Sequence, residues 1–213
     1  MTQRRNRRQT KGHKKFRLVI EVFCDGETEK QYVESVRSKL RNESVTFHIH
    51  PLFGRADRFE DVFEEIQSLL DTEEYKHNML IFYITDMDTI HAQKKFQDYN
   101  QMKQKCLASP DARERLFIIE SRPCFEFWLL LHYAHTTKPF ARCDEVEAEL
   151  KDHWPEYKKS SKCAKQIFDK LQDRLETAIE RARKIKPTHS YSQMYILFDE
   201  LKKRLPDCDL TQP

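Results

Sequence analysis

The sequence predicts an α/β protein with a mainly parallel sheet and helices on both of its faces. Short segments rich in β-branched and aromatic residues alternate with stretches of helical length. Strands separated by helices of this length form crossover βαβ units, which build parallel sheets. The chain has only 3 glycines in 213 residues, so we also expect short connections and few positions with unusual backbone angles.

The first part of the chain carries the strand signals. Strands are expected over 16–23 (FRLVIEVF), 45–52 (VTFHIHPL), 78–85 (NMLIFYIT) and 115–121 (RLFIIES). Helices are expected between them over 28–40, 58–71 and 92–107. The α/β core therefore covers residues 16–121.

The second part of the chain is expected to be helical, because no strand signal follows Glu120. Helices are expected at about 124–134, 144–153, 161–185 and 190–204, and Pro, Ser and Thr supply turns and caps between them. These helices predict a C-terminal helical lobe over 122–213 that packs on the core.

Composition limits the class of protein further. The longest apolar run, FWLLLHY, is far below the roughly 20 residues that a bilayer requires. The N-terminal region is basic, but the apolar stretch after it is short and carries Glu21, which is a poor signal peptide. We therefore expect a cytoplasmic protein without a membrane span.

The cysteines predict neither a disulfide framework nor a zinc site. No CxxC pair occurs among Cys24, Cys106, Cys124, Cys143, Cys163 and Cys208. His48 and His50 share a strand face, but two histidines are a weak basis for structural zinc. Buried or idle thiols are the preferred interpretation.

The positive charge is concentrated at the N-terminus. Residues 1–15 form a basic arm without any acidic residue, and its basic residues are Arg4, Arg5, Arg7, Arg8, Lys11, Lys14 and Lys15. Such an arm neutralises phosphates when it binds nucleic acid or another polyanion. The alternative is a disordered, solubilising tail, and composition alone does not separate the two.

Two acidic clusters follow predicted strands. CDGETE (24–29) follows the first strand and DMD (86–88) follows the third. Sites in parallel sheets form at the carboxyl ends of strands, so Asp25, Asp86 and Asp88 are expected to converge there. Two aspartates on one strand face repel each other unless a cation lies between them, and Mg²⁺ or Mn²⁺ suits carboxylate ligands. Alternatively, Asp25 caps a helix, and the two later aspartates lie in a solvated turn.

A third carboxylate lies in the segment PCFEFWLLLHY. Apolar residues cover nearly every face of this predicted helix, so Glu126 is expected to be buried and to need a partner. The partner is either a metal ion or Arg122, one turn earlier. His132 is expected to be a hydrogen-bonded core residue. Lys158, in EYKKSSK, is by composition one of many surface lysines.

These motifs, taken in order, resemble the RloB-like protein family. The resemblance spans roughly residues 16–204 and rests on CDGETEKQYV, DMD, PCFEFWLLLHY and a YK before a long helix. It implies a Rossmann-like, TOPRIM-type core with Mg²⁺-dependent phosphodiester chemistry. It also implies a role in phage-defence or restriction-linked loci, often beside an AAA/ABC-type ATPase partner.

The resemblance also assigns roles to individual residues. Asp86 and Asp88 match the DxD metal ligands, and Glu126 would serve a second metal or position the first. Asp25 stands before Gly26, where the family usually has a glutamate, so Glu27 or Glu29 is a candidate to share its role as metal ligand and base. Lys158 matches a basic position that would stabilise charge on the phosphate.

The predicted function is therefore a Mg²⁺-dependent nuclease that acts on DNA or RNA. Asp25 or Glu29 would take a proton from water, and Lys158 would offset developing negative charge. A chain of 213 residues leaves no room for a topoisomerase gate, and no Gly-rich nucleotide-binding loop supports primase chemistry. The alternative is a non-catalytic adaptor of an ATPase complex, with a degenerate acidic pocket. The sequence leaves open whether the substrate is DNA, tRNA, other RNA or a small nucleotide, and the oligomeric state.

Overall fold

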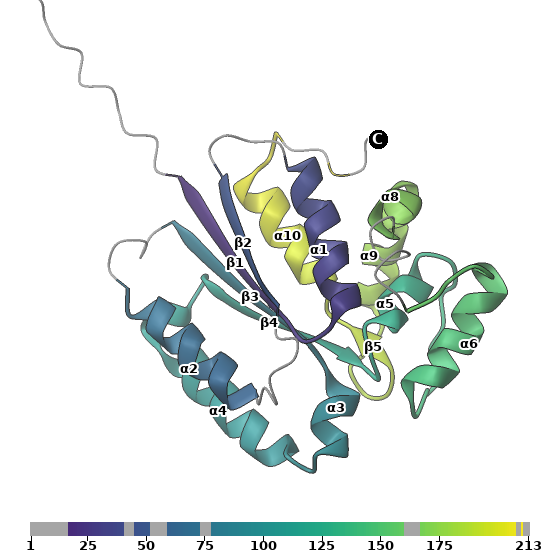
Figure 1. The fold of residues 1–213 in the computed structure, drawn as a ribbon, viewed down its shortest axis with the longest axis horizontal. Coiled ribbons are helices and arrows are strands. Elements are labelled where there is room, and N and C mark those ends of the chain that lie inside the picture. Colours follow the sequence, from purple (N-terminus) through teal and green to yellow (C-terminus); the bar gives the residue numbers. More distant parts are fainter. Residues whose placement is uncertain are drawn as a thin grey trace, which may run out of the picture.

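A five-stranded sheet runs through the middle of the computed structural model, which describes residues 17–40, 45–51, 59–72, 78–159, 167–207 and 210 (Figure 1). The strand order is β2-β1-β3-β4-β5. The strands are β1 (Leu18–Cys24), β2 (Val45–Pro51), β3 (Met79–Asp86), β4 (Leu116–Arg122) and β5 (Tyr191–Ser192). The first four are parallel and β5 is antiparallel to β4. The expected mainly parallel α/β sheet is confirmed.

Helices cover both faces of this sheet. The α-helices are α1 (Glu27–Lys39), α2 (Phe59–Leu70), α3 (Met87–Ala92), α4 (Phe96–Ala108), α5 (Glu126–Leu131), α6 (Cys143–His153), α8 (Ile167–Leu171), α9 (Leu175–Lys184) and α10 (Tyr195–Arg204). Two short 3-10 turns are η2 (Pro110–Ala112) and η3 (Gln172–Arg174). Figure 1 shows α2 and α4 on one face, with α1 and α10 on the other.

The two faces have separate apolar cores because strand residues alternate in direction. On β3, Leu80, Phe82 and Ile84 join the core beneath α1, α5 and α10, whereas Ile81 and Tyr83 join the core beneath α2 and α4. Side chains of a strand point alternately to the two faces, so a strand covered on both sides reads as a continuous apolar run. This is why MLIFYIT was recognisable as a strand.

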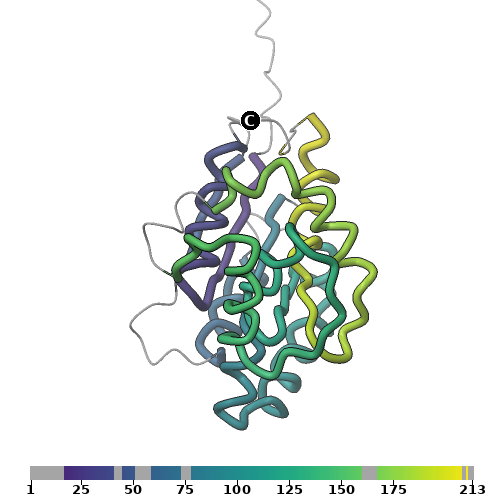
Figure 2. Tube along the Cα trace, turned by 90° about the vertical axis from the view of Figure 1, so that its right-hand side faces the viewer, coloured from purple at the N-terminus to yellow at the C-terminus, as the bar shows by residue number. Residues whose placement is uncertain are grey.

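The C-terminal part of the chain completes the sheet, which the sequence did not predict. Tyr191 and Ser192 pair with Arg122 and Ser121 at the edge of β4. A strand of two residues is too short to show any period, so the expected helix over 190–204 begins only at Tyr195. In the perpendicular view the yellow C-terminal helix lies beside the sheet and the green segments lie in front of it (Figure 2). The division into a core and a lobe stays a prediction.

The expected helix over 92–107 corresponds to α4, which begins four residues later than expected, and the sequence did not predict the short α3 before it. α3 ends at Ala92 and α4 begins at Phe96, and Lys94 between them has a positive φ of 57°. No helix in the described part of the chain is long and apolar enough to cross a membrane. The basic arm, residues 1–15, lies outside the described residues, as does Cys163.

Candidate acidic site

The carboxyl ends of β1, β3 and β4 meet at one edge of the sheet. β3 lies between the other two strands, so the loops after all three are neighbours. Backbone hydrogen bonds join these loops: the Asp25 amide donates to the Ile84 carbonyl (3.3 Å), and the Asp88 amide donates to the Pro123 carbonyl (3.0 Å). The topology therefore brings the three acidic motifs of the sequence to one place, as expected.

The sequence argument placed both Asp86 and Asp88 on the strand, but only Asp86 lies there. Asp86 is the last residue of β3, and Asp88 lies in the first turn of α3. Asp86 makes no capping hydrogen bond, and its buried Oδ1 has no hydrogen-bond partner among the described residues. Burial raises the pKa of Asp86 well above its usual value, and the charges of Glu29, Glu126 and Asp88 add to the effect. The alternative of a solvated turn does not describe Asp86.

Glu29 is the acidic residue of α1 that faces this cluster. It is 2% exposed, although it lies in the first turn of a helix. Burial, together with the nearby charges of Glu126 and Asp25, raises its pKa to about 8. Glu27, the other candidate, accepts a hydrogen bond from Gln31 (2.6 Å). Of the two candidates, the geometry favours Glu29.

Gly26 provides the space that Glu29 occupies. A Cβ atom at position 26 would lie 2.3 Å from Glu29 Oε2 and 2.9 Å from its Cδ. The backbone of Gly26 is extended, with φ −127° and ψ 161°, so no unusual angle calls for glycine. The absence of a side chain at position 26 lets the carboxylate of Glu29 fold back against the backbone there.

Asp25 has its own hydroxyl partners. Its Oδ2 accepts a hydrogen bond from Thr85 Oγ1 (2.5 Å), and Tyr83 Oη lies 3.5 Å away. Burial raises the pKa of Asp25 to about 6, against the opposing effect of these hydrogen bonds. Asp25 does not cap α1, whose N-cap is Gly26. Its carboxylate accepts a hydrogen bond from the backbone amide of Asp86, so it lies next to that residue.

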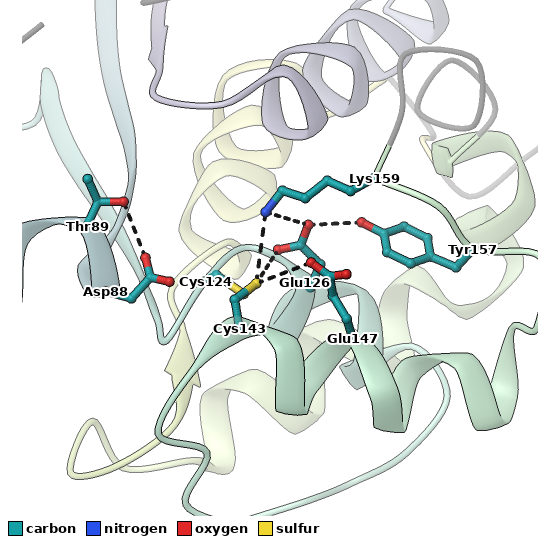
Figure 3. A network of polar contacts seen from close by, with 8 residues as sticks. All are labelled: Asp88, Thr89, Cys124, Glu126, Cys143, Glu147, Tyr157 and Lys159. Atoms are coloured by element: carbon teal, nitrogen blue, oxygen red, sulfur yellow. Dashed lines mark hydrogen bonds and ion pairs between the residues drawn. A yellow bond between two sulfur atoms is a disulfide. The ribbon is translucent and has the colours of Figure 1, made fainter. Parts of the chain in front are cut away.

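Glu126 is fully buried, as predicted, but its partners differ from the expected Arg122. Tyr157 Oη donates a hydrogen bond to Oε1 (3.0 Å), and Lys159 Nζ lies 3.1 Å from the same oxygen (Figure 3). No described contact joins Glu126 to Arg122, which is exposed. The structural alternative of an Arg122 ion pair is therefore wrong.

The lysine at the site is Lys159, and the predicted Lys158 is exposed and makes no described contact with the acidic residues. Burial alone would lower the pKa of Lys159, but the charges of Glu126, Asp86 and Glu29 outweigh it and raise the pKa. The Lys159 side chain remains 47% exposed. Its ammonium group is therefore accessible to a ligand while it faces three carboxylates.

A disulfide borders the site, contrary to the expectation of idle thiols. Cys124 and Cys143 are bonded, with Cα atoms 5.6 Å apart. Cys143 Sγ lies 3.1 Å from Glu126 Oε2. The bond links the loop after β4 to the start of α6. Cys24 and Cys106 are buried free thiols, as predicted.

The three histidines considered above, His48, His50 and His132, make contacts within the fold. His132 is buried, its Nδ1 lies 3.0 Å from the Trp128 carbonyl oxygen, and burial lowers its pKa to about 4. His48 and His50 both contact Glu21, at 2.8 and 2.6 Å. Burial alone would raise the pKa of Glu21, but the hydrogen bonds with His50 and His48 outweigh it and lower the pKa. The Glu21 hydrogen bond raises the pKa of His50.

The acidic residues fit a hard divalent cation by chemistry. Carboxylate oxygens are the ligands that Mg²⁺ and Mn²⁺ prefer. A buried carboxylate oxygen without a partner, on Asp86, and raised pKa values on clustered carboxyl groups are expected where a cation would supply the missing positive charge. Asp86 and Asp88 are the residues that would hold it, with Glu126 beside them.

The side chains are not arranged as a closed metal cage. Among the described residues, the only three ligand-type side chains with atoms within 4.8 Å of one another are Cys124, Glu126 and Cys143. Thiolates bind metals, whereas sulfurs in a disulfide are poor ligands. The carboxylates of Asp25, Asp86 and Asp88 do not reach this proximity. Metal binding at the carboxylates would therefore draw them closer together.

Sequence reasoning missed Lys159 and Tyr157. The pattern EYKKSSK contains two adjacent lysines, and composition cannot tell which one faces the site. The spacing of Gly26 and Glu29 in CDGETE was the available signal for Glu29. The predicted arm residues Arg4 to Lys15 lie outside the described part of the chain, so their role stays a prediction.

Comparison with known proteins identifies a family. The family model described as RloB-like protein matches residues 20–204. A search of curated proteins gave no match, and a search of solved structures gave none either.

Proposed function

Since this chain belongs to the RloB-like protein family, we propose that it is a divalent-metal-dependent phosphodiesterase that cleaves nucleic acid. One observation carries the proposal: Glu29, Asp86 and Glu126 are buried or half-buried beside one another, with Lys159 as their cationic neighbour. Burying like charges together is costly unless a ligand compensates for it. Such arrangements are typical of functional sites.

A metal ion has a defined place in this proposal. Asp86 and Asp88 would hold Mg²⁺ or Mn²⁺, with Glu126 beside them. The bound ion would supply Lewis-acid polarisation of a phosphoryl group. The hard oxygen donors make a soft metal a poor occupant.

The remaining chemistry belongs to side chains of this chain. Glu29, held against Gly26, would accept a proton from the attacking water. Lys159 would compensate the negative charge that develops on the phosphate. Tyr157 holds Glu126 in its orientation by the hydrogen bond to Oε1, so its role is positioning.

A nuclease assay tests the proposal. Purified protein would be incubated with Mg²⁺, Mn²⁺ or EDTA and with plasmid DNA, single-stranded DNA, bulk tRNA or a chromogenic phosphodiester. We expect cleavage of at least one substrate that requires metal and is lost in Asp86→Asn. Cleavage that persists at equal rate in Asp86→Asn would come from a contaminant or another site and would contradict the proposal.

A matched pair of variants tests the role of Glu29. Glu27 and Glu29 both lie in the first turn of α1, but only Glu29 faces the acidic cluster. Glu29→Gln should abolish cleavage, and Glu27→Gln should leave it unchanged. Equal effects of the two changes would show that the total negative charge in the first turn of α1 matters, and not the position of Glu29.

A second candidate function is a non-catalytic adaptor. Two observations favour it: Asp25 is engaged by Thr85, and the aspartates do not converge within 4.8 Å. Failure of every substrate above, with metal present, would favour this alternative. In either case, a role in phage defence beside an AAA/ABC-type ATPase is proposed on the family resemblance alone, and co-purification with such an ATPase would test it.

A further inference from the structure

A pocket of about 690 Å³ opens beside the acidic site. Its lining comes from α3, from the end of β4 and from the start of α6, and includes Asp88, His91, Arg122, Pro123 and Arg142. Asp88 therefore belongs both to the candidate metal site and to this pocket. Whatever occupies the pocket lies next to the proposed reaction centre.

Two arginines give the pocket its positive charge. Arg122 is exposed and makes no ion pair with another described residue. Arg142 is exposed and pairs with Asp144 at 2.5 Å, both side chains being more than 60% exposed. Exposed ion pairs contribute little free energy, so a phosphate can replace Asp144 as the partner of Arg142. Both guanidinium groups are thus available to an anion.

The disulfide joins the two segments that carry these arginines. Arg122 lies two residues before Cys124, and Arg142 directly precedes Cys143. Figure 3 shows the disulfide beside Glu126 at the start of α6, with Asp88 on its other side. The covalent link limits how far the two arginine-bearing segments can separate, which lowers the ordering cost of binding an anionic ligand.

The lining does not suit a nucleobase. The other residues that line the pocket are Thr89, Ala92, Gln93 and Ala141, and there is no Phe, Tyr or Trp among the lining residues. Pockets for nucleotides and other small ligands are mostly apolar and aromatic, and bases bind to proteins by stacking. The one aromatic ring in the lining, that of His91, is already stacked on Phe96. Arginine side chains commonly contact phosphate oxygens.

From these observations we propose that the pocket binds the phosphate backbone of a nucleic-acid strand, through Arg122 and Arg142, next to the scissile phosphodiester. The inference rests on the proposed function and narrows its substrate to a polymer whose bases point away from the pocket. A nucleoside monophosphate has a single phosphate group and cannot place one phosphate at the arginines and another at the candidate metal site. Recognition at this pocket is consequently independent of base sequence.

The test measures binding without hydrolysis. Fluorescence anisotropy in EDTA would follow a labelled 12-residue single strand, once as DNA and once as RNA, with the full chain over a range of salt concentrations. Arg122→Ala and Arg142→Ala should each weaken binding about tenfold and lower the salt slope by about 1. Asp144→Asn should strengthen binding, because it frees Arg142.

Arg113→Ala is the matched control. Arg113 is exposed and precedes β4, whereas Arg122 ends the same strand, so the two lie at opposite ends of the sheet. The control should bind as the unchanged protein does, and thermal melts of all variants should agree. The basic arm is present in every variant and cannot cause a difference between them.

Two results would overturn the inference. In one, Arg122→Ala and Arg142→Ala bind both strands as tightly as Arg113→Ala does. In the other, a mononucleotide displaces the strand at equal concentration, which would make the ligand a small nucleotide. The binding test needs neither metal nor turnover. If the arginine variants bind normally while the protein has metal-dependent nuclease activity, only this inference is refuted. If the arginine variants bind more weakly but no substrate is cleaved, only the proposed function is refuted.

Discussion

Replacing Gly26 by alanine should separate catalysis from stability. The new Cβ would lie 2.3 Å from Glu29 Oε2, whereas ordinary van der Waals contact begins at 3.4 Å. The carboxylate must therefore move by about 1 Å, and a displacement of that size at a reacting group costs about 100-fold in rate. We expect the nuclease activity to fall by about this factor.

The same change should have a small effect on folding. The extended backbone at Gly26 accepts alanine without strain. Alanine is a poorer N-cap than glycine by about 0.5–1 kcal/mol. It also restricts the unfolded chain, which offsets the loss by about 0.4–1 kcal/mol. The net change is within about 1 kcal/mol, or about 4 °C in melting temperature.

The assay pairs initial cleavage rates with thermal melts. Gly26→Ala would be compared with Glu29→Gln, which removes the charge without moving the backbone, and with Glu27→Gln as the inert change. Full activity of Gly26→Ala, with an unchanged melting temperature, would refute the reasoning, because Glu29 would then not need its place against Gly26.

Three further outcomes follow from the contacts. Lys159→Ala should lower the cleavage rate about 100-fold, whereas Lys158→Ala should leave it unchanged; equal rates for the two variants would contradict the assignment. The Glu21–His50 pair stabilises the fold between pH 4.5 and 6.5: its contribution is lost below pH 4.5 through the lowered pKa of Glu21, and above pH 6.5 through the raised pKa of His50. The melting temperature of His50→Gln should therefore fall furthest below that of the unchanged protein inside this window, and a constant difference across pH would argue against the pair. Cys143→Ser removes the disulfide, which closes a loop with a sequence separation of 19 and should contribute about 3 kcal/mol to the free energy of unfolding. Reductant should lower the melting temperature of the unchanged protein but not that of the variant. An equal response of the two would be contrary evidence.

The sheet could be predicted because its strands are buried on both faces. The strand expected over 78–85 is observed as Met79–Asp86, and the strand expected over 115–121 is observed as Leu116–Arg122. Continuous apolar runs of this kind carry their own signal. The carboxyl ends of parallel strands then placed the acidic motifs together, from the order of elements alone.

The remaining features depend on tertiary contacts that leave no local pattern. β5 has two residues and is held by its pairing with β4. The disulfide joins cysteines 19 positions apart, and no spacing rule predicts such a pair. The choice between Lys158 and Lys159 depends on the direction of a side chain after Tyr157, which a sequence of adjacent lysines does not specify.

A metal titration followed by thermal melting tests the central claim most directly. The melting temperature of the unchanged protein should rise with the logarithm of the Mn²⁺ concentration. At a concentration of 100 times Kd, bound Mn²⁺ should add about 2.7 kcal/mol to the free energy of unfolding. Asp86→Asn should be at least as stable without metal, because it removes like-charge repulsion with Glu29 and Glu126, and it should lose the response to Mn²⁺. An unchanged protein whose melting temperature does not respond to millimolar Mn²⁺ would contradict the metal site and with it the proposed phosphodiesterase.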